Sequence, residues 1–169
     1  MARRSIRLWG LLGSCLALGV AACSSVEPHY LASAEPTSAL PSGSTLTEKA
    51  QTNFEHGEFG LAADNFAKAV EVDPVNAEAW LGLAASYDHI RRFDLADKAY
   101  TKVQSLIGST PSVLNNLGYS YYLRGDLEKS KSTLAAAYRG DRHNPYILSN
   151  IELLNEKLTS LGKEPLHLN

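Results

Sequence analysis

Cysteine is nearly absent from this chain of 169 residues, and its two cysteines, Cys15 and Cys23, both lie close to the N-terminus. The rest of the sequence therefore excludes a disulfide framework, a thiolate metal site and a cysteine nucleophile. The five histidines are scattered, and no two of them have the i, i+4 spacing of a zinc-binding helix. Glycine-rich phosphate loops and the nucleophile elbow of hydrolases are also missing. We expect no enzymatic activity, no metal and no small-molecule substrate; an enzyme that follows no known motif stays the alternative.

Basic residues are concentrated at the N-terminus and are outnumbered elsewhere. The net charge of the chain is −2, and residues 1–22 contribute three arginines and no acidic residue. Without that segment, 13 basic residues stand against 18 acidic ones. A mildly acidic domain lacks the positive surface that binds phosphate backbones or anionic lipid headgroups. We therefore expect no nucleic-acid partner for the folded part of the chain.

A short apolar segment follows the N-terminal arginines. Arg3, Arg4 and Arg7 precede fifteen uncharged residues that end at Ala22. A membrane-spanning helix needs about 20 apolar residues, so this segment is short for that role. A basic start, a short apolar run and small residues at its end are the parts of a secretory signal. We predict that residues 1–22 are a signal peptide, with a retained transmembrane anchor as the alternative.

The signal ends in Val20-Ala21-Ala22-Cys23, which resembles the lipobox of bacterial lipoproteins. The resemblance implies that Cys23 carries a covalent lipid after cleavage, which is the only prosthetic group we expect. Two or more acyl chains anchor a protein stably, whereas one anchors it marginally. Ser24 follows the lipidated cysteine, and a residue other than Asp at this position favours the outer membrane. We expect an outer-membrane lipoprotein facing the periplasm; the inner membrane and plain secretion are the alternatives.

The next segment, residues 23–42, has the composition of a linker. It is rich in Ser, Ala, Pro, Glu and Thr, contains three prolines and shows no hydrophobic periodicity. Such a composition cannot bury enough apolar surface to offset the entropy lost on ordering. We predict a lipidated flexible tether over 23–42, which holds a folded domain over 43–169 away from the membrane.

From residue 43 onward the sequence repeats itself every 34 residues, in registers that begin at Gly43, Ala77, Pro111 and Pro145. Positions 4, 7, 8 and 11 of a register form the i, i+3, i+4, i+7 stripe of one helix. Positions 17, 20, 24 and 27 form the stripe of a second helix. Small residues at positions 8 and 20 would let the two helices approach closely where they cross; these residues are Ala50, Ala84, Gly118, Ala62, Ala96 and Ser130.

This pattern resembles the tetratricopeptide repeat. The register over 77–110 matches it best, whereas the first register has Lys49 and Asn53 at positions that are usually apolar. The fourth register has one helix, over about 145–160, and its polar residue at position 8 suits a capping helix that meets solvent. The resemblance implies an all-α fold, a short solenoid of about three helix-turn-helix repeats plus a C-terminal capping helix.

In solenoids of this kind the first helices of the repeats line a groove that binds other proteins, with contacts at positions 2, 5, 6, 9, 12 and 13. Applied to the second, third and fourth registers, the resemblance implies a protein-binding groove. Its residues would be Glu78, Leu81, Ala85, Asp88, His89, Ser112, Asn115, Asn116, Tyr119, Tyr122, Tyr146, Ser149, Asn150 and Leu153.

Amides and tyrosines are prominent in this predicted groove. Asn116 and Asn150 lie one period apart, and a side-chain amide can hold an extended backbone because it both donates and accepts. Tyrosines add the flat contact area that protein interfaces favour. The alternative is that the asparagines cap or bridge neighbouring helices. Because Lys and Arg do not occupy these positions, the groove is expected to prefer a neutral, apolar or mildly basic segment to an acidic terminus.

Two stretches resemble the TadD family, the tetratricopeptide lipoproteins of tight-adherence (Flp) pilus systems. They are LNNLGYSYYLRGD over 114–126 and NPYILSNIELL over 144–154. The resemblance implies a membrane-anchored, pilotin-like adaptor that helps an outer-membrane secretin reach or assemble in its membrane. The partner would then be a secretin or another pilus-assembly component. A general envelope scaffold that recruits peptidoglycan enzymes or other lipoproteins is the alternative.

Overall fold

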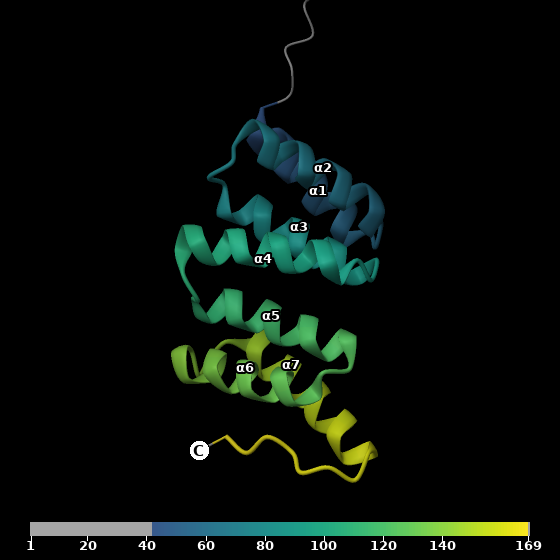
Figure 1. Ribbon diagram of the computed structural model, residues 1–169, viewed down its shortest axis with the longest axis vertical. Coiled ribbons are helices and arrows are strands. Elements are labelled where there is room, and N and C mark those ends of the chain that lie inside the picture. The colour runs from purple at the N-terminus through teal and green to yellow at the C-terminus, as the bar shows by residue number, and fades with distance from the viewer. Residues whose placement is uncertain (1–41, 169) are drawn as a thin grey trace, which may run out of the picture. The chain divides into compact units, whose positions relative to one another are not determined.

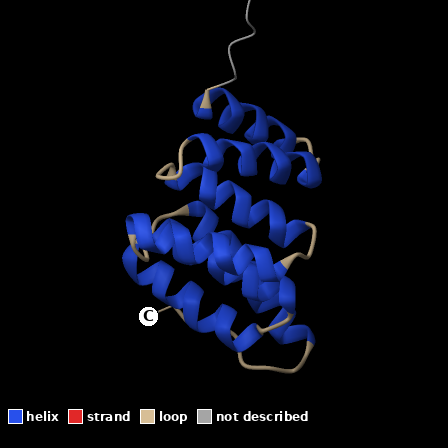
Figure 2. Ribbon diagram, turned by 45° about the horizontal axis from the view of Figure 1, so that its top comes forward, coloured by secondary structure: helices blue, strands red, loops and turns tan. Residues whose placement is uncertain are grey.

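The computed structural model describes residues 42–168, so the predicted signal peptide, the lipidation site Cys23 and nearly all of the tether lie outside the described residues. The described part contains helices joined by short loops and no strand (Figure 2). The helices are α1 (Gly43–Glu55), α2 (Phe59–Val72), α3 (Ala77–His89), α4 (Phe93–Ile107), α5 (Pro111–Arg124), α6 (Leu127–Gly140) and α7 (Pro145–Ser160).

The helices form three successive hairpins, α1–α2, α3–α4 and α5–α6, and α7 packs against α5 and α6 (Figure 1). The first helices begin at Gly43, Ala77, Pro111 and Pro145, the four residues at which the repeat registers were predicted to begin. The predicted all-α solenoid, with about three repeats and a capping helix, is therefore confirmed. No helix within residues 42–168 has both the length and the apolar character needed to cross a bilayer.

A capping side chain fixes the start of every first helix. Ser42, Asn76, Thr110 and Asn144 each precede a register by one residue, and each side chain accepts a hydrogen bond from a backbone N–H in the first turn. Such a cap stabilises a helix by about 1 kcal/mol. Because the caps recur every 34 residues, they set the phase of the whole solenoid.

The turn inside each hairpin uses a left-handed residue at position 15. Gly57 and Gly125 have φ of 76° and 81°, the left-handed conformation that often ends a helix. The second hairpin has Arg91 at this position, with φ of 61°, so a side chain with a Cβ adopts a conformation that favours glycine. The same turn is thus made at a conformational cost in the second repeat.

The small residues sit where the helices of each hairpin cross. Ala84 and Ala96 are 0% exposed, and Gly118 is buried in the same way. Ser130 donates from its Oγ to the carbonyl oxygen of Gly118 at 2.8 Å, and a Cβ added at Gly118 would lie 2.7 Å from Leu134. The close approach that the sequence predicted at positions 8 and 20 is therefore confirmed.

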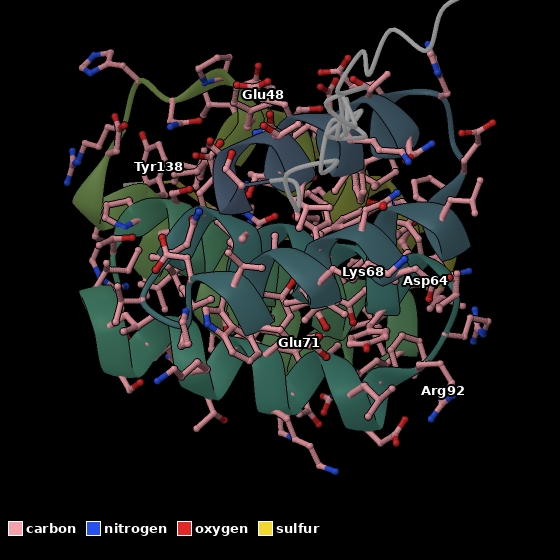
Figure 3. The ribbon with its side chains drawn as sticks, turned by 90° about the horizontal axis from the view of Figure 1, so that it is seen from above. Glu48, Asp64, Lys68, Glu71, Arg92 and Tyr138 are labelled. Atoms are coloured by element: carbon pink, nitrogen blue, oxygen red, sulfur yellow. The ribbon has the colours of Figure 1, made fainter. Side chains whose placement is uncertain are left out.

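The core is divided into two hydrophobic clusters. The first contains buried residues from α1 to α4, among them Phe66, Leu83 and Tyr100. The second joins α6 and α7 and contains Leu134 and Leu154. Helix α5 contributes partly buried side chains to both clusters. On the outer side of α2, the exposed Asp64, Lys68 and Glu71 follow one helical stripe that faces away from the core (Figure 3).

The first repeat and the capping helix have asparagines at position 11, where the middle repeats have tyrosines, and these asparagines make side-chain hydrogen bonds. In the first repeat, Asn53 accepts from the amide of Asn65 at 2.9 Å. After α7, the chain returns over the second cluster, and Asn155 holds Leu166 through both backbone groups. The Leu166 N–H donates to Asn155 Oδ1 at 2.6 Å, and Asn155 Nδ2 donates to the Leu166 carbonyl at 3.1 Å. An asparagine side chain of this solenoid thus holds a non-helical backbone segment.

Candidate functional site

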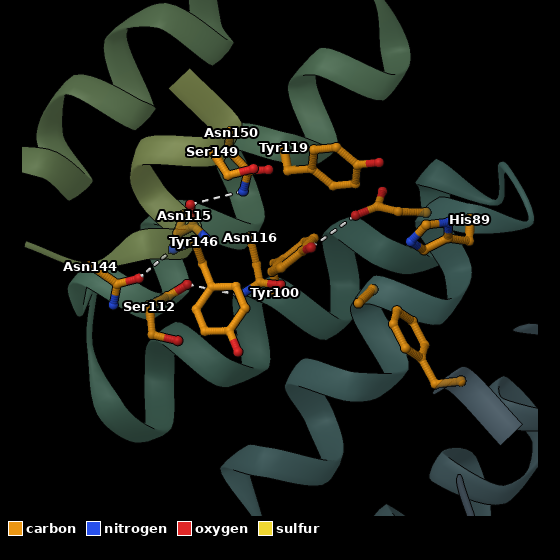
Figure 4. A pocket seen from close by; sticks show the side chains of 13 residues that line it. His89, Tyr100, Ser112, Asn115, Asn116, Tyr119, Asn144, Tyr146, Ser149 and Asn150 are labelled. Carbon is orange, nitrogen blue, oxygen red and sulfur yellow. Dashed lines mark hydrogen bonds between the residues drawn. The ribbon is translucent and has the colours of Figure 1, made fainter. Parts of the chain in front are cut away.

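A hollow of about 320 Å³ opens between the first helices of the repeats and α7 (Figure 4). Side chains from α1, α3, α4, α5 and α7 line it, together with the cap that precedes α7. They are Phe54, Ala85, Asp88, His89, Tyr100, Ser112, Asn115, Asn116, Tyr119, Asn144, Tyr146, Ser149 and Asn150. Residues from all three hairpins and the capping helix therefore meet at one surface.

A second hollow of about 360 Å³ adjoins the first toward the N-terminal end of the solenoid. It shares Phe54, Ala85 and Asn116 with the first hollow, so the two form one continuous surface, which we call the groove. Its remaining lining residues are Gln51, Glu55, Phe66, Glu78, Leu81 and Gly82.

The groove gathers most of the residues that the sequence proposed. Glu78 and Leu81 line the second hollow, while Tyr122 and Leu153 line neither hollow. Tyr122 is nevertheless close, because its ring stacks on that of Tyr119 at 5.9 Å. Contact of these residues with a ligand stays a prediction. The predicted residues that line the first hollow are Ala85, Asp88, His89, Ser112, Asn115, Asn116, Tyr119, Tyr146, Ser149 and Asn150.

Several lining residues were missing from the proposed set. Gln51, Phe54 and Glu55 occupy positions 9, 12 and 13 of the first register, so the same rule would have found them. The predicted set covered the second, third and fourth registers alone. Phe66 and Tyr100 come from position 24 of the second helices, and no groove rule covers that position. The Phe66 ring lies directly against Gly82, which has no side chain to separate it from the groove.

Aromatic rings follow one another along one edge of the groove. Phe54 meets His89 edge to face at 5.3 Å, and His89 stacks on Phe59 at 4.0 Å. His89 also lies 6.1 Å from Tyr119, which stacks on Tyr122. Burial in this row lowers the pKa of His89 below its ordinary value, although the nearby Asp88 opposes the effect. The imidazole is therefore neutral at pH 7, and the row offers flat, uncharged faces to a ligand.

Asp88 lies at the base of the first hollow and is 3% exposed. It accepts hydrogen bonds from the Tyr100 hydroxyl at 2.9 Å and from the Ser120 hydroxyl at 2.6 Å; the former is drawn in Figure 4. Burial raises the pKa of the Asp88 carboxyl, while these two bonds and the charge of Arg124 lower it. Asp88 therefore shapes the base of the groove from inside, and its carboxylate belongs to a network that joins α3, α4 and α5.

The asparagines make the bridging contacts that the sequence offered as the alternative, and their contact with a ligand stays a prediction. Asn150 Nδ2 donates to Asn115 Oδ1 at 2.9 Å, which bridges α7 to α5 (Figure 4), and Asn116 donates to the Ser112 carbonyl within α5. Bridging and local bonding thus occur. Within residues 42–168, no hydrogen bond is made by Asn115 Nδ2 or Asn150 Oδ1, which leaves a donor and an acceptor at the groove.

Charge in the groove has one sign. Its ionised lining residues are Glu55, Glu78 and Asp88, and neither lysine nor arginine lines either hollow. Across residues 42–168, no group of His, Cys, Asp and Glu side chains is arranged to hold a metal ion. What the groove offers is therefore aromatic faces, amides and acidic groups.

Comparison with known proteins agrees with this architecture. Residues 47–105 match the family model of the tetratricopeptide repeat. The chain is similar to the formate-dependent nitrite reductase complex bifunctional subunit NrfFG of Haemophilus influenzae, at 28% identity over 121 residues. That match covers 68% of this chain and 31% of the relative, so the chain spans about a third of the length of that protein.

Two solved structures show the same arrangement of helices. The pilF protein of Pseudomonas aeruginosa is similar with a TM-score of 0.59 and 23% identity, over 72% of this chain and 55% of that one. The first tetratricopeptide domain of Spaghetti (RPAP3), bound to the HSP90 peptide SRMEEVD, is similar with a TM-score of 0.59 and 20% identity, over 69% and 93% of the two chains. With its three hairpins, recurring caps and small crossing residues, this chain has the fold of a tetratricopeptide-repeat solenoid.

Proposed function

We propose that this protein is a membrane-anchored adaptor that binds a partner protein through the groove and acts like a pilotin in Flp/Tad pilus assembly. In this role the groove captures a segment of an outer-membrane secretin, while lipid on Cys23 carries the complex to the membrane. The observation that carries the proposal is the continuity of the groove across three repeats and α7, because an extended segment needs such a length of contact.

The chemistry of the groove supports capture of an extended segment. The Asn115–Asn150 pair leaves a donor and an acceptor among the residues that line the first hollow, and Asn115 is 8% exposed; such a pair matches the alternating polar groups of a peptide backbone. The hold of Asn155 on Leu166 shows that such an amide can engage backbone within this fold. Tyr146, which is 75% exposed, extends the aromatic area to the C-terminal end of the groove.

The envelope role is supported by the sequence outside the groove. The lipobox-like Val20-Ala21-Ala22-Cys23 supplies an anchor, and the tether over 23–42 supplies reach. The TadD-like stretches over 114–126 and 144–154 point to pilus assembly, and the fold is shared with pilF.

Capture of the secretin can be tested with the full chain purified in detergent from cells that also produce the secretin. We expect the secretin to copurify and its yield to fall about tenfold when Asn116→Ala and Tyr119→Ala are combined, because central interface residues dominate binding. The matched control combines Asp64→Ala and Lys68→Ala on the outer side of α2 and should leave the yield unchanged. Recovery of peptidoglycan enzymes without secretin would favour a general envelope scaffold instead.

The anchor is tested separately. Cells labelled with radioactive palmitate should incorporate label into the wild-type protein and none into Cys23→Ala. The variant should also leave the membrane fraction, since loss of the acyl chains removes the apolar surface that binds the bilayer. Membrane retention of an unlabelled Cys23→Ala protein would show that another segment provides the anchor.

A further inference from the structure

We propose that the first hollow of the groove is a subsite for a basic side chain, so that the captured segment presents an arginine or lysine to Asp88 between the rings of Phe54, His89 and Tyr119. The proposal rests on the proposed function, because it assumes that an extended protein segment occupies the groove. It adds the chemical class of that segment and the side chain by which the groove selects it.

The charged side chains that line the groove are all acidic. Glu55 and Glu78 line the second hollow, Asp88 lies at the base of the first, and no basic residue lines either. Glu55 and Glu78 lie where the first two repeats meet, and Asp88 extends the acidic character along α3 toward the third repeat. The charged side chains that line the groove would attract a cation and repel a carboxylate, and Arg124, which lies 3.6 Å from Asp88, lines neither hollow.

The negative charge of Asp88 is only partly balanced by the positive charge of Arg124. Arg124 is the arginine nearest to it, at 3.6 Å from Asp88 Oδ1, yet the same guanidinium lies 2.7 Å from Asp97. One positive charge is therefore shared between two carboxylates and is held more closely by the other one. The formal charges of the three groups sum to −1. The Asp97 side chain is 56% exposed and is screened by water, whereas the Asp88 side chain is 2% exposed, where a charge acts more strongly than in water.

Aromatic rings form the walls of the first hollow beside Asp88. The rings of Phe54 and His89 stand 5.3 Å apart edge to face, and Tyr119 lies 6.1 Å from His89. A guanidinium stacks on such faces, and its aliphatic stem can cover apolar surface such as that of Ala85. Because burial keeps His89 neutral, the wall adds no positive charge that would repel the incoming group.

The comparison with the Spaghetti domain sharpens the inference. That domain is bound to the peptide SRMEEVD, which ends in an acidic run. The groove described here lacks the basic lining that such a run would need and has acidic groups instead. Two grooves of one fold would then differ in the sign of the ligand they accept.

The test uses three labelled heptapeptides built from serine, alanine and leucine that differ only at the central residue, which is arginine, citrulline or glutamate. Citrulline keeps the shape of arginine without its charge. Binding to the full chain in detergent is followed by fluorescence anisotropy, at low salt because screening weakens exposed charges. We expect the arginine peptide to bind at least about fivefold more tightly than the citrulline peptide, and the glutamate peptide to bind most weakly.

Variants identify the charges responsible. Asp88→Asn and Glu78→Gln should each lower the ratio of arginine to citrulline affinity, and circular dichroism will show that each variant is folded. Asp64→Asn removes the same charge from the outer side of α2 and should leave the ratio unchanged. The Glu78→Gln variant keeps the test decisive if Asp88→Asn does not fold, because Glu78 is exposed.

An arginine-to-citrulline ratio near one on the wild-type protein would overturn the inference, as would a ratio that both groove variants leave unchanged. Failure of all three peptides to bind would overturn it as well. The proposed function is decided separately by the capture of secretin. If the secretin copurifies normally but the peptides show no preference for charge, the basic subsite is contradicted and the adaptor role is still supported.

Discussion

The buried part of the junction between the first and second repeats is apolar, although Gln51 and Glu78 share a hydrogen bond at its exposed edge, whereas the junction between the second and third contains a buried carboxylate. At the first junction, the ring of Phe66 packs directly over Gly82 of α3. At the second, Asp88 of α3 bonds to Tyr100 of α4 and to Ser120 of α5. The same repeat therefore meets its two neighbours through opposite kinds of chemistry.

This difference has physical consequences. Apolar packing depends on volume and shape, and it responds weakly to pH. The stability contributed by a buried, hydrogen-bonded carboxylate depends instead on its protonation state and on whether its partners are present. The groove lies across both junctions, so each junction can be altered separately and the effect on stability compared.

The largest expected effect is at the apolar junction. Phe66 is 2% exposed and belongs to the first cluster, so Phe66→Ala removes a buried ring and leaves a cavity. We expect a loss of about 3–5 kcal/mol in the free energy of unfolding, measured by urea denaturation followed by circular dichroism. Leu61→Ala on the same helix is the control, because Leu61 is 54% exposed and should cost less than about 1 kcal/mol. Equal losses for both variants would contradict the tight packing described.

The next effect tests the same junction from the other side. A Cβ added at Gly82 would lie 2.2 Å from the Phe66 ring, so Gly82→Ala forces that buried ring to move. We expect it to lower the free energy of unfolding by about 1–3 kcal/mol. Gly60→Ala is the matched control: nothing lies within 4 Å of its added Cβ, and alanine favours a helix, so a gain of about 0.5 kcal/mol is expected. A gain at both positions would show that Phe66 can move without cost.

The polar junction is tested through pH. Burial raises the pKa of Asp88 in the folded protein above its value of about 3.9 in an unfolded chain. The folded state therefore binds the proton more tightly, and the contribution of Asp88 to stability is greatest when the carboxyl is protonated. That contribution falls as pH rises from about 4 through the raised folded pKa.

Asp88→Asn lacks this titration. The stability of the wild-type protein relative to Asp88→Asn should accordingly decrease as pH rises above about 4, as measured by urea denaturation at a series of pH values. Asp64→Asn, on the exposed side of α2, should show a small difference that does not vary with pH in this way. A difference between wild type and Asp88→Asn that grows with pH would mean that the bonds from Ser120 and Tyr100 outweigh burial.

The helices and their limits could be predicted because the signals are local. The residue before each register is a capping residue, and proline follows it in two of the four cases, at Pro111 and Pro145. The residues at positions 8 and 20 are small because the two helices of each hairpin cross there, and this crossing recurs in every repeat. For the same reason the groove positions of the second, third and fourth registers fell largely on one surface.

The features that escaped prediction depend on residues far apart in the sequence. Asp88 occupies position 12, which the repeat pattern treats as a groove position, but its buried carboxylate is bonded to Ser120, 32 residues later. The hold of Asn155 on Leu166 depends on a C-terminal segment that has no periodicity. The left-handed backbone of Arg91 could be predicted in part. Arginine itself does not favour this conformation, but the neighbouring repeats have glycine at the same position 15.

The smallest expected effect concerns the turn that lies next to the polar junction. Arg91 adopts φ of 61°, and a left-handed residue with a Cβ costs about 1–2 kcal/mol, partly offset after replacement by the greater freedom of glycine in the unfolded chain. Arg91→Gly should therefore raise the free energy of unfolding by about 0.5 kcal/mol. The Arg91 guanidinium lies 5.4 Å from the Phe93 ring, but Arg124 also lies over that ring, at 5.0 Å, and remains in the variant. Gly57→Ala provides the opposite change at the equivalent turn and should destabilise the protein by about 1 kcal/mol. A loss of stability in Arg91→Gly would mean that the guanidinium on Phe93 contributes more to this junction than the backbone strain costs.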